Sequence, residues 1–152
     1  MRISREKMFM EIAHVVAQRA TCQRLNVGAI IVRNNRIVSI GYNGTESGAA
    51  HCAGEACEGW HAGCHITIHA EDNALRYLPE GMTSNNLELY CTDSPCKACW
   101  EMLKQDGRVG RVYFRTPYRI NEHLLEECHI EVFRVLPSGT VIDWRNNKMV
   151  KQ

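Results

Sequence analysis

The chain has 152 residues, of which 45% are hydrophobic and 23% are charged, as in an ordinary soluble globule. This length suits one domain that buries its core without disulfide bonds, so we expect a single domain over residues 1–152. The formal net charge of +1 leaves no basic surface for nucleic acid, and no segment has the apolar length of a membrane span or an export signal. We therefore expect a cytoplasmic protein that binds neither nucleic acid nor membrane.

The first half of the chain predicts a helix followed by a hairpin. Residues 4–20 have apolar side chains at helical spacing, and Ser4 can cap the helix. Two β-branched runs follow at 27–32 and 36–42, separated by two asparagines. Because asparagine tolerates positive φ, this pair predicts a tight antiparallel turn. Both runs are mostly apolar on both faces, which is typical of strands covered by helices on each side.

Regular patterns stop between residues 43 and 68, where glycine, alanine, cysteine and histidine dominate. A loop of this length in a domain is usually functional or otherwise tied down. Beyond it the patterns predict helix 69–78, strand 87–91, helix 96–105, strand 111–115, helix 122–127 and strand 130–136, then a polar tail from Ser138. This order predicts an α/β fold with a mixed five-stranded sheet between helical layers.

Residues 72–94 separate two short motifs whose residue types bind metal. The first is His69-Ala70-Glu71, and the second runs from Pro95 to Cys99. One imidazole and two thiolates, from His69, Cys96 and Cys99, make three zinc ligands and leave the fourth tetrahedral position free, as in a catalytic site. Glu71 is close enough in sequence to exchange protons at that position without binding the metal. A closed structural zinc site would have no use for Glu71 or Pro95.

The predicted elements place both motifs at the starts of helices. His69 opens one helix, while Cys96 and Cys99 lie in the first turn of another. A CxxC motif at a helix start puts both sulfurs on the same side of the turn, and the positive end of the helix favours thiolate. We therefore expect two helix N-termini to converge on one metal ion.

These motifs resemble those of the zinc-dependent cytidine deaminase-like superfamily and, within it, the deoxycytidylate (dCMP) deaminases. The resemblance covers roughly residues 5–120, and four stretches carry it: RLNVGA at 24–29, GYNG at 41–44, HAEDNA at 69–74 and SPCKAC at 94–99. It implies the three-layer α/β/α cytidine deaminase-like fold. One position departs from the family pattern, because Glu46 stands where the branch usually has the proline of GYNGxPxG.

The resemblance implies hydrolytic removal of the 4-amino group of dCMP, giving dUMP and ammonia. Zinc activates the attacking water in that reaction. Glu71 takes a proton from this water, passes it to N3 and later helps to protonate the leaving amine. Asn43 is our candidate for the deoxyribose, because an amide both donates and accepts hydrogen bonds. Arg24 is our candidate for the 5′-phosphate, because guanidinium matches phosphate geometry. A turn asparagine and a solvated surface arginine are the alternatives at these two positions.

The resemblance also implies assembly and regulation. Members of the dCMP branch are typically hexamers that are activated by dCTP and inhibited by dTTP. We therefore expect a homo-oligomer, these two effectors, and Mg²⁺ accompanying a bound triphosphate.

The six cysteines outside the metal motif fall into two groups. Cys91 and Cys128 lie in or beside predicted core elements and are expected to be buried small hydrophobic residues. Some bacterial and phage members of the branch hold a second, structural zinc on cysteines placed like the other four. The resemblance thus implies a second Zn²⁺ on Cys22 and Cys52 with two of Cys57, Cys64, His51, His61 and His65, Cys57 and Cys64 being preferred. Reduced cysteines packed in the loop are the alternative.

Two other functions fit part of the pattern. A deaminase acting on a base in tRNA or single-stranded DNA shares the signature, but it needs a basic groove and stacking aromatic residues. This chain is close to neutral and has 7% aromatic residues. A non-catalytic zinc module would complete the three ligands with a fourth side chain and would leave Glu71 without a role.

Overall fold

The computed structural model describes residues 1–21, 25–44 and 68–152. Its helices are α1 (Arg5–Ala17), α2 (Ala70–Arg76), α3 (Lys97–Asp106) and the 3₁₀ helix η2 (Glu122–Leu125). Its strands are β1 (Gly28–Arg33), β2 (Arg36–Tyr42), β3 (Leu87–Asp93), β4 (Val109–Thr116), β5 (Glu131–Val135), β6 (Val141–Asp143) and β7 (Lys148–Lys151). Within the described ranges, no helix combines the length and apolar character needed to cross a membrane.

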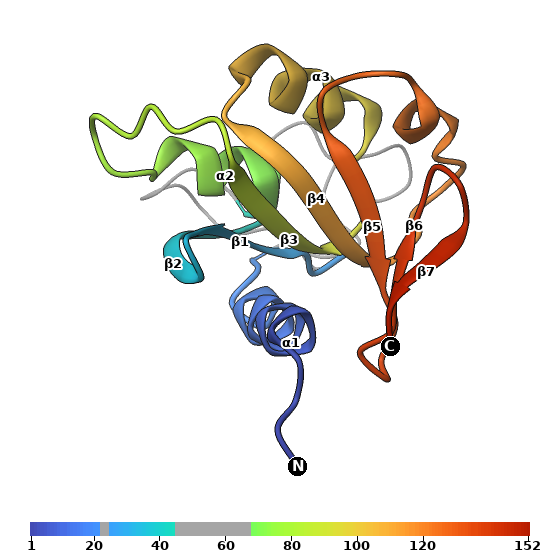
Figure 1. Ribbon diagram of the computed structural model, residues 1–152. Helices are drawn as coiled ribbons and strands as arrows, with labels where there is room; N and C mark the ends of the chain where they lie inside the picture. The colour runs from blue at the N-terminus through green and yellow to red at the C-terminus, as the bar shows by residue number, and fades with distance from the viewer. Residues whose placement is uncertain (22–24, 45–67) are drawn as a thin grey trace.

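The strands form one mixed sheet in the order β2-β1-β3-β4-β5-β6-β7 (Figure 1). β3, β4 and β5 run parallel, β1 is antiparallel to both β2 and β3, and β6 and β7 continue the sheet as antiparallel strands. The mixed sheet is confirmed, but the predicted number of five strands is wrong, because the structure has seven. β6 has three residues and β7 is exposed along its length, so neither carries the apolar alternation that predicts a strand.

Two hydrophobic cores, one on each face of the sheet, lie between the sheet and the helices that cover it. This confirms the α/β/α arrangement. α1 packs Phe9 and Met10 against one face of the sheet, while Ala74 of α2 and Trp100 of α3 pack against the other face (Figure 1). β1 is buried from Gly28 to Val32, as predicted for a strand covered on both sides. The same prediction is wrong for β2, which forms the edge of the sheet and leaves much of its length exposed. An apolar run alone does not distinguish a central strand from an edge strand.

Local signals predicted the first elements well. The backbone nitrogen of Lys7 donates to Ser4 Oγ at 3.1 Å, which confirms the cap, although α1 ends at Ala17 rather than at residue 20. Asn34 and Asn35 have φ values of 49° and 63°, the left-handed conformation that the tight hairpin turn requires. The predicted helix at 122–127 is instead the shorter 3₁₀ helix η2.

Two glycines allow a helix backbone to rest directly on a strand. A Cβ atom added at Gly41 of β2 would lie 2.5 Å from the backbone nitrogen of Ala74 in α2. A Cβ atom added at Gly28 of β1 would lie 2.5 Å from the backbone nitrogen of Ala17 in α1. Both glycines belong to stretches that resemble the dCMP deaminases, so helix packing explains part of those motifs.

Candidate metal centre

His69, Cys96 and Cys99 meet beyond the carboxyl end of β3, where α2 and α3 begin. Nδ1 of His69 lies 3.1 Å from Sγ of Cys99 and 3.5 Å from Sγ of Cys96, and the three ligand atoms all lie within 4.8 Å of one another. His69 is the N-cap residue of α2 and Cys96 that of α3, and neither side chain makes a capping hydrogen bond. The two side chains can therefore turn toward a common centre, as the sequence predicts.

The donor set fits zinc. A tetrahedral Zn²⁺ with ordinary bond lengths holds an imidazole nitrogen and a thiolate sulfur about 3.6 Å apart. The two nitrogen-to-sulfur distances at His69 are close to this value. Thiolate and imidazole are also the ligand types that zinc prefers, and three protein ligands are the number found in catalytic sites.

The two thiols of the cluster differ in acidity. A hydrogen bond from Cys99, together with the neighbouring His69, lowers the pKa of Cys96 to about 3. The hydrogen bond to Cys96, together with burial, raises the pKa of Cys99. Cys96 is therefore the first thiol to ionise, and a divalent cation at the centre would release the proton that Cys99 holds.

Glu71 lies beside the three ligands, in the first turn of α2, and is only 4% exposed. Its Oε2 accepts a hydrogen bond from Cys99 Sγ at 3.4 Å. Burial raises the pKa of the Glu71 carboxyl. A raised pKa brings a carboxyl closer to the range in which it both takes and gives protons near neutral pH. Its position next to the ligand set therefore fits proton transfer.

Polar contacts with β2 hold α2 in place. Ser39 Oγ of β2 donates to the Ala74 carbonyl oxygen of α2 at 2.6 Å, and Asn73 Nδ2 of α2 donates to the Tyr42 carbonyl oxygen at 2.8 Å. Together with the close approach at Gly41, these bonds fix the helix that carries Glu71. This contact of Ser39 was not predictable from sequence, because a serine inside a strand carries no local signal of its helix partner.

Gly41→Ala is expected to weaken zinc binding at least about tenfold, because the new methyl group overlaps the backbone of α2 and displaces His69. Gly28→Ala is the matched control, since it creates the same kind of overlap with α1 on the opposite face of the sheet. Both variants should lose about 1–3 kcal/mol of folding free energy. Thermal unfolding and chelator competition measure the two effects, and equal zinc affinity in both variants would contradict a specific role for Gly41.

Asn43 has a structural role that the sequence did not predict. The side chain is 7% exposed, its Oδ1 accepts from the backbone nitrogen of Val27 at 2.8 Å, and its Nδ2 donates to the Leu25 carbonyl oxygen at 2.6 Å. These bonds tie the end of β2 to the segment before β1. The amide retains one N–H and one oxygen lone pair, so its contact with the sugar stays a prediction.

Two of the remaining predicted residues lie in the part of the chain that the structure describes, and the others lie outside it. Cys91 is buried as expected, and Cys128 is half-buried and packs against the core. Outside the described residues lie Arg24, Glu46, Cys22, Cys52, Cys57, Cys64, His51, His61 and His65.

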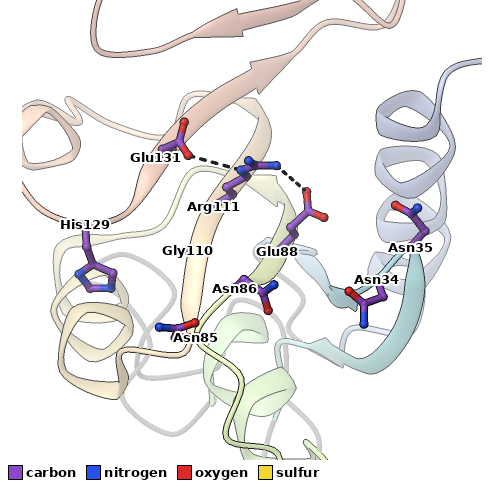
Figure 2. A pocket seen from close by; sticks show the side chains of 9 residues that line it. All are labelled: Asn34, Asn35, Asn85, Asn86, Glu88, Gly110, Arg111, His129 and Glu131. Carbon is purple, nitrogen blue, oxygen red and sulfur yellow. Dashed lines mark hydrogen bonds and ion pairs between the residues drawn. The ribbon is translucent and has the colours of Figure 1, made fainter.

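A polar hollow of about 450 Å³ lies at the amino ends of β3, β4 and β5, opposite the end that carries the metal ligands (Figure 2). Arg111 crosses it, at 3.4 Å from Glu131 and 4.0 Å from Glu88. Asparagines and His129 line the rest of the hollow. Because its charged side chains pair with one another and the metal ligands lie elsewhere, the candidate chemistry belongs to the metal centre.

Known proteins are similar to this chain in sequence and in fold. Residues 3–116 match the family model of the cytidine and deoxycytidylate deaminase zinc-binding region. The ComE operon protein 2 of Bacillus subtilis (strain 168) is 36% identical over 151 residues, which cover 97% of this chain and 79% of that protein. A deoxycytidylate deaminase of Schizosaccharomyces pombe is 33% identical over 147 residues, which cover 90% of this chain and 45% of that protein. The chain therefore spans less than half the length of the fission yeast enzyme.

A solved structure adds a three-dimensional match. The dCMP deaminase from the cyanophage S-TIM5, in complex with dCMP and dUMP, is 36% identical and superimposes with a TM-score of 0.74. The match covers 88% of this chain and 98% of the phage chain. Almost the whole of that smaller protein thus has a counterpart here.

Proposed function

Since the chain belongs to the cytidine and deoxycytidylate deaminase family, we propose that it hydrolyses dCMP to dUMP and ammonia. The observation that carries this proposal is the convergence of His69, Cys96 and Cys99 beside the buried carboxyl of Glu71. The proposed unit is one deaminase domain over residues 1–152.

The proposed mechanism divides the work between a metal and a carboxylate. His69, Cys96 and Cys99 would hold a Zn²⁺ ion, which supplies a water activated for nucleophilic attack at neutral pH. Glu71 accepts a proton from the attacking water, delivers it to N3 of the pyrimidine, and later helps to protonate the leaving amine. The proton for the amine comes from the hydroxyl group that the attack leaves on C4, and Glu71 takes it and passes it on. Each uptake and release returns the carboxylate to its starting state, so one residue serves both steps.

Substrate recognition is proposed to use two further residues. The spare N–H and lone pair of the Asn43 amide would bond a deoxyribose hydroxyl while its other groups keep their backbone bonds. Arg24 would bind the 5′-phosphate through its guanidinium.

A substrate panel tests the proposed function. Ammonia release from dCMP should far exceed release from deoxycytidine, because the nucleoside lacks the phosphate that anchors the substrate. CMP and dCTP in the same assay test the sugar and the length of the phosphate chain. Equal rates on dCMP and deoxycytidine would contradict a phosphate site, and activity that required an added polynucleotide would favour a tRNA or DNA deaminase.

Assembly, regulation and a second metal are proposed from the family resemblance. The proposed enzyme is a hexamer that is activated by dCTP and inhibited by dTTP, with Mg²⁺ bound to the triphosphate. A second, structural Zn²⁺ is proposed on Cys22, Cys52, Cys57 and Cys64. Light scattering, dCMP saturation curves with each triphosphate, and zinc analysis measure these properties.

A further inference from the structure

The segment that delivers Cys96 to the metal centre is held by the loop that follows β4. The chain leaves β3 at Asp93 and reaches α3 through Ser94, Pro95 and Cys96. The backbone nitrogen of Ser94 donates to the Thr116 carbonyl oxygen, at the end of β4, at 3.0 Å. The Cys96 side chain makes no capping hydrogen bond, and the Cys96 carbonyl oxygen accepts from the backbone nitrogen of Trp100, in α3, at 2.9 Å. On its other side, the position of Cys96 depends on what holds Ser94 and Pro95.

The Ser94 hydroxyl is the first point of attachment. Ser94 is 3% exposed, and its Oγ accepts hydrogen bonds from the backbone nitrogen of Tyr118 at 2.8 Å and from Asn121 Nδ2 at 2.7 Å. These two bonds occupy both acceptor positions of the hydroxyl oxygen. Asn121 is itself buried, and its backbone carbonyl oxygen accepts a hydrogen bond from the backbone nitrogen of Leu124, in η2. The loop and the turn before α3 are thus joined inside the protein.

His123 makes the second attachment. Its Nε2 lies 3.0 Å from the carbonyl oxygen of Pro95, which belongs to the peptide bond leading into Cys96. A carbonyl oxygen only accepts, so Nε2 carries the hydrogen and donates it. The proline ring fixes φ on one side of this carbonyl group, and the imidazole fixes its direction. The peptide plane that enters Cys96 therefore has little freedom.

The backbone of Arg119 indicates that contacts impose the shape of this loop. Arg119 has a φ of 58°, a left-handed conformation that costs energy for a residue with a side chain. Asn121 Nδ2 lies 3.3 Å from the Arg119 carbonyl oxygen. One buried amide thus holds both the strained turn and the Ser94 hydroxyl.

We propose that Asn121 and His123 are positioning residues of the metal centre. They act through Ser94 and Pro95 to fix Cys96, and in this way they set the affinity for zinc. The inference rests on the proposed function for the identity of the metal. Removing an outer partner of a metal ligand typically lowers metal affinity about 10- to 100-fold.

Zinc dissociation constants of the full chain, measured by chelator competition without substrate, test the proposal. His123→Leu removes the donor to Pro95 and should weaken zinc binding about 10- to 100-fold. His123→Gln, whose amide can donate to the same carbonyl oxygen, should restore most of the affinity. His14→Leu is the matched control, because His14 Nδ1 also lies 2.9 Å from a backbone carbonyl oxygen, that of Met10, but in α1. It should leave the zinc affinity unchanged.

Asn121→Ala removes the amide that bonds the Ser94 hydroxyl, the first attachment, and should also weaken zinc binding. This variant keeps the test decisive if His123→Leu fails to fold. Unchanged affinity in both variants would overturn the proposal. An equal loss in His14→Leu would reduce it to a general effect on stability. Tight zinc binding that follows this pattern in a chain inactive on dCMP would refute the proposed function alone.

Discussion

Glu71→Gln is expected to lower kcat for dCMP by about 10²- to 10⁴-fold, because an amide has the shape of the carboxyl but does not shuttle protons. The zinc content should not change, since Glu71 lies beside the ligand set rather than within it. Steady-state deamination and metal analysis on the same preparation measure both quantities.

Asp72→Asn is the matched control for this variant. Asp72 follows Glu71 in α2 and undergoes the same chemical change, but its carboxylate pairs with Arg76 at 3.0 Å on a partly exposed face of the helix. The control should deaminate dCMP nearly as fast as the parent chain. Loss of zinc from Glu71→Gln would identify Glu71 as a ligand, and full activity would assign the proton transfer to another group.

Cys99→Ser is expected to remove one zinc per chain and to abolish deamination, because a serine hydroxyl is a much poorer zinc ligand than a thiolate. Cys99 is the buried member of the cluster and contacts both His69 and Glu71, so its loss also disturbs the carboxyl that we propose transfers protons. Metal analysis after dialysis, together with dCMP turnover, measures the outcome.

Cys128→Ser provides the control, because Cys128 is a half-buried cysteine outside the metal cluster. It should keep the zinc count of the parent chain. A count that falls from two to one in Cys99→Ser would support the second zinc, whereas a fall from one to zero would leave only the catalytic centre. A Cys99→Ser chain that retained all its zinc and its activity would refute the proposed ligand set.

The residues of the candidate metal centre were predictable from sequence because their types and spacing form two recognisable motifs. His69 and Cys96 begin helices, and a helix start fixes where its first side chains point without knowledge of the rest of the fold. The chemistry of the ligand types does not depend on tertiary context either. That the two helix starts meet at one centre followed from the resemblance to the deaminase motifs, because His69 and Cys96 are 27 residues apart.

The supporting residues were not predictable because their partners lie far along the chain and no motif links them to those partners. Ser39 bonds to α2 and His123 bonds to Pro95, and no periodic pattern links such distant positions. The same limit applies to Asn43, whose bonds to Leu25 and Val27 depend on how β1 and β2 fold together. β6 and β7 were missed for a related reason. They are strands because they pair with neighbouring strands, not because they bury an apolar face.

The contact at Gly41 also has a mechanical consequence. Backbone atoms of α2 rest on backbone atoms of β2, so the height of the helix above the sheet does not depend on a side chain that can change rotamer. A joint of this kind is stiffer than one filled by flexible side chains, and it transmits less of their thermal motion. The height of Glu71 above β2 is thereby protected from rotamer changes in the core, which suits the proton transfers that we propose for this residue.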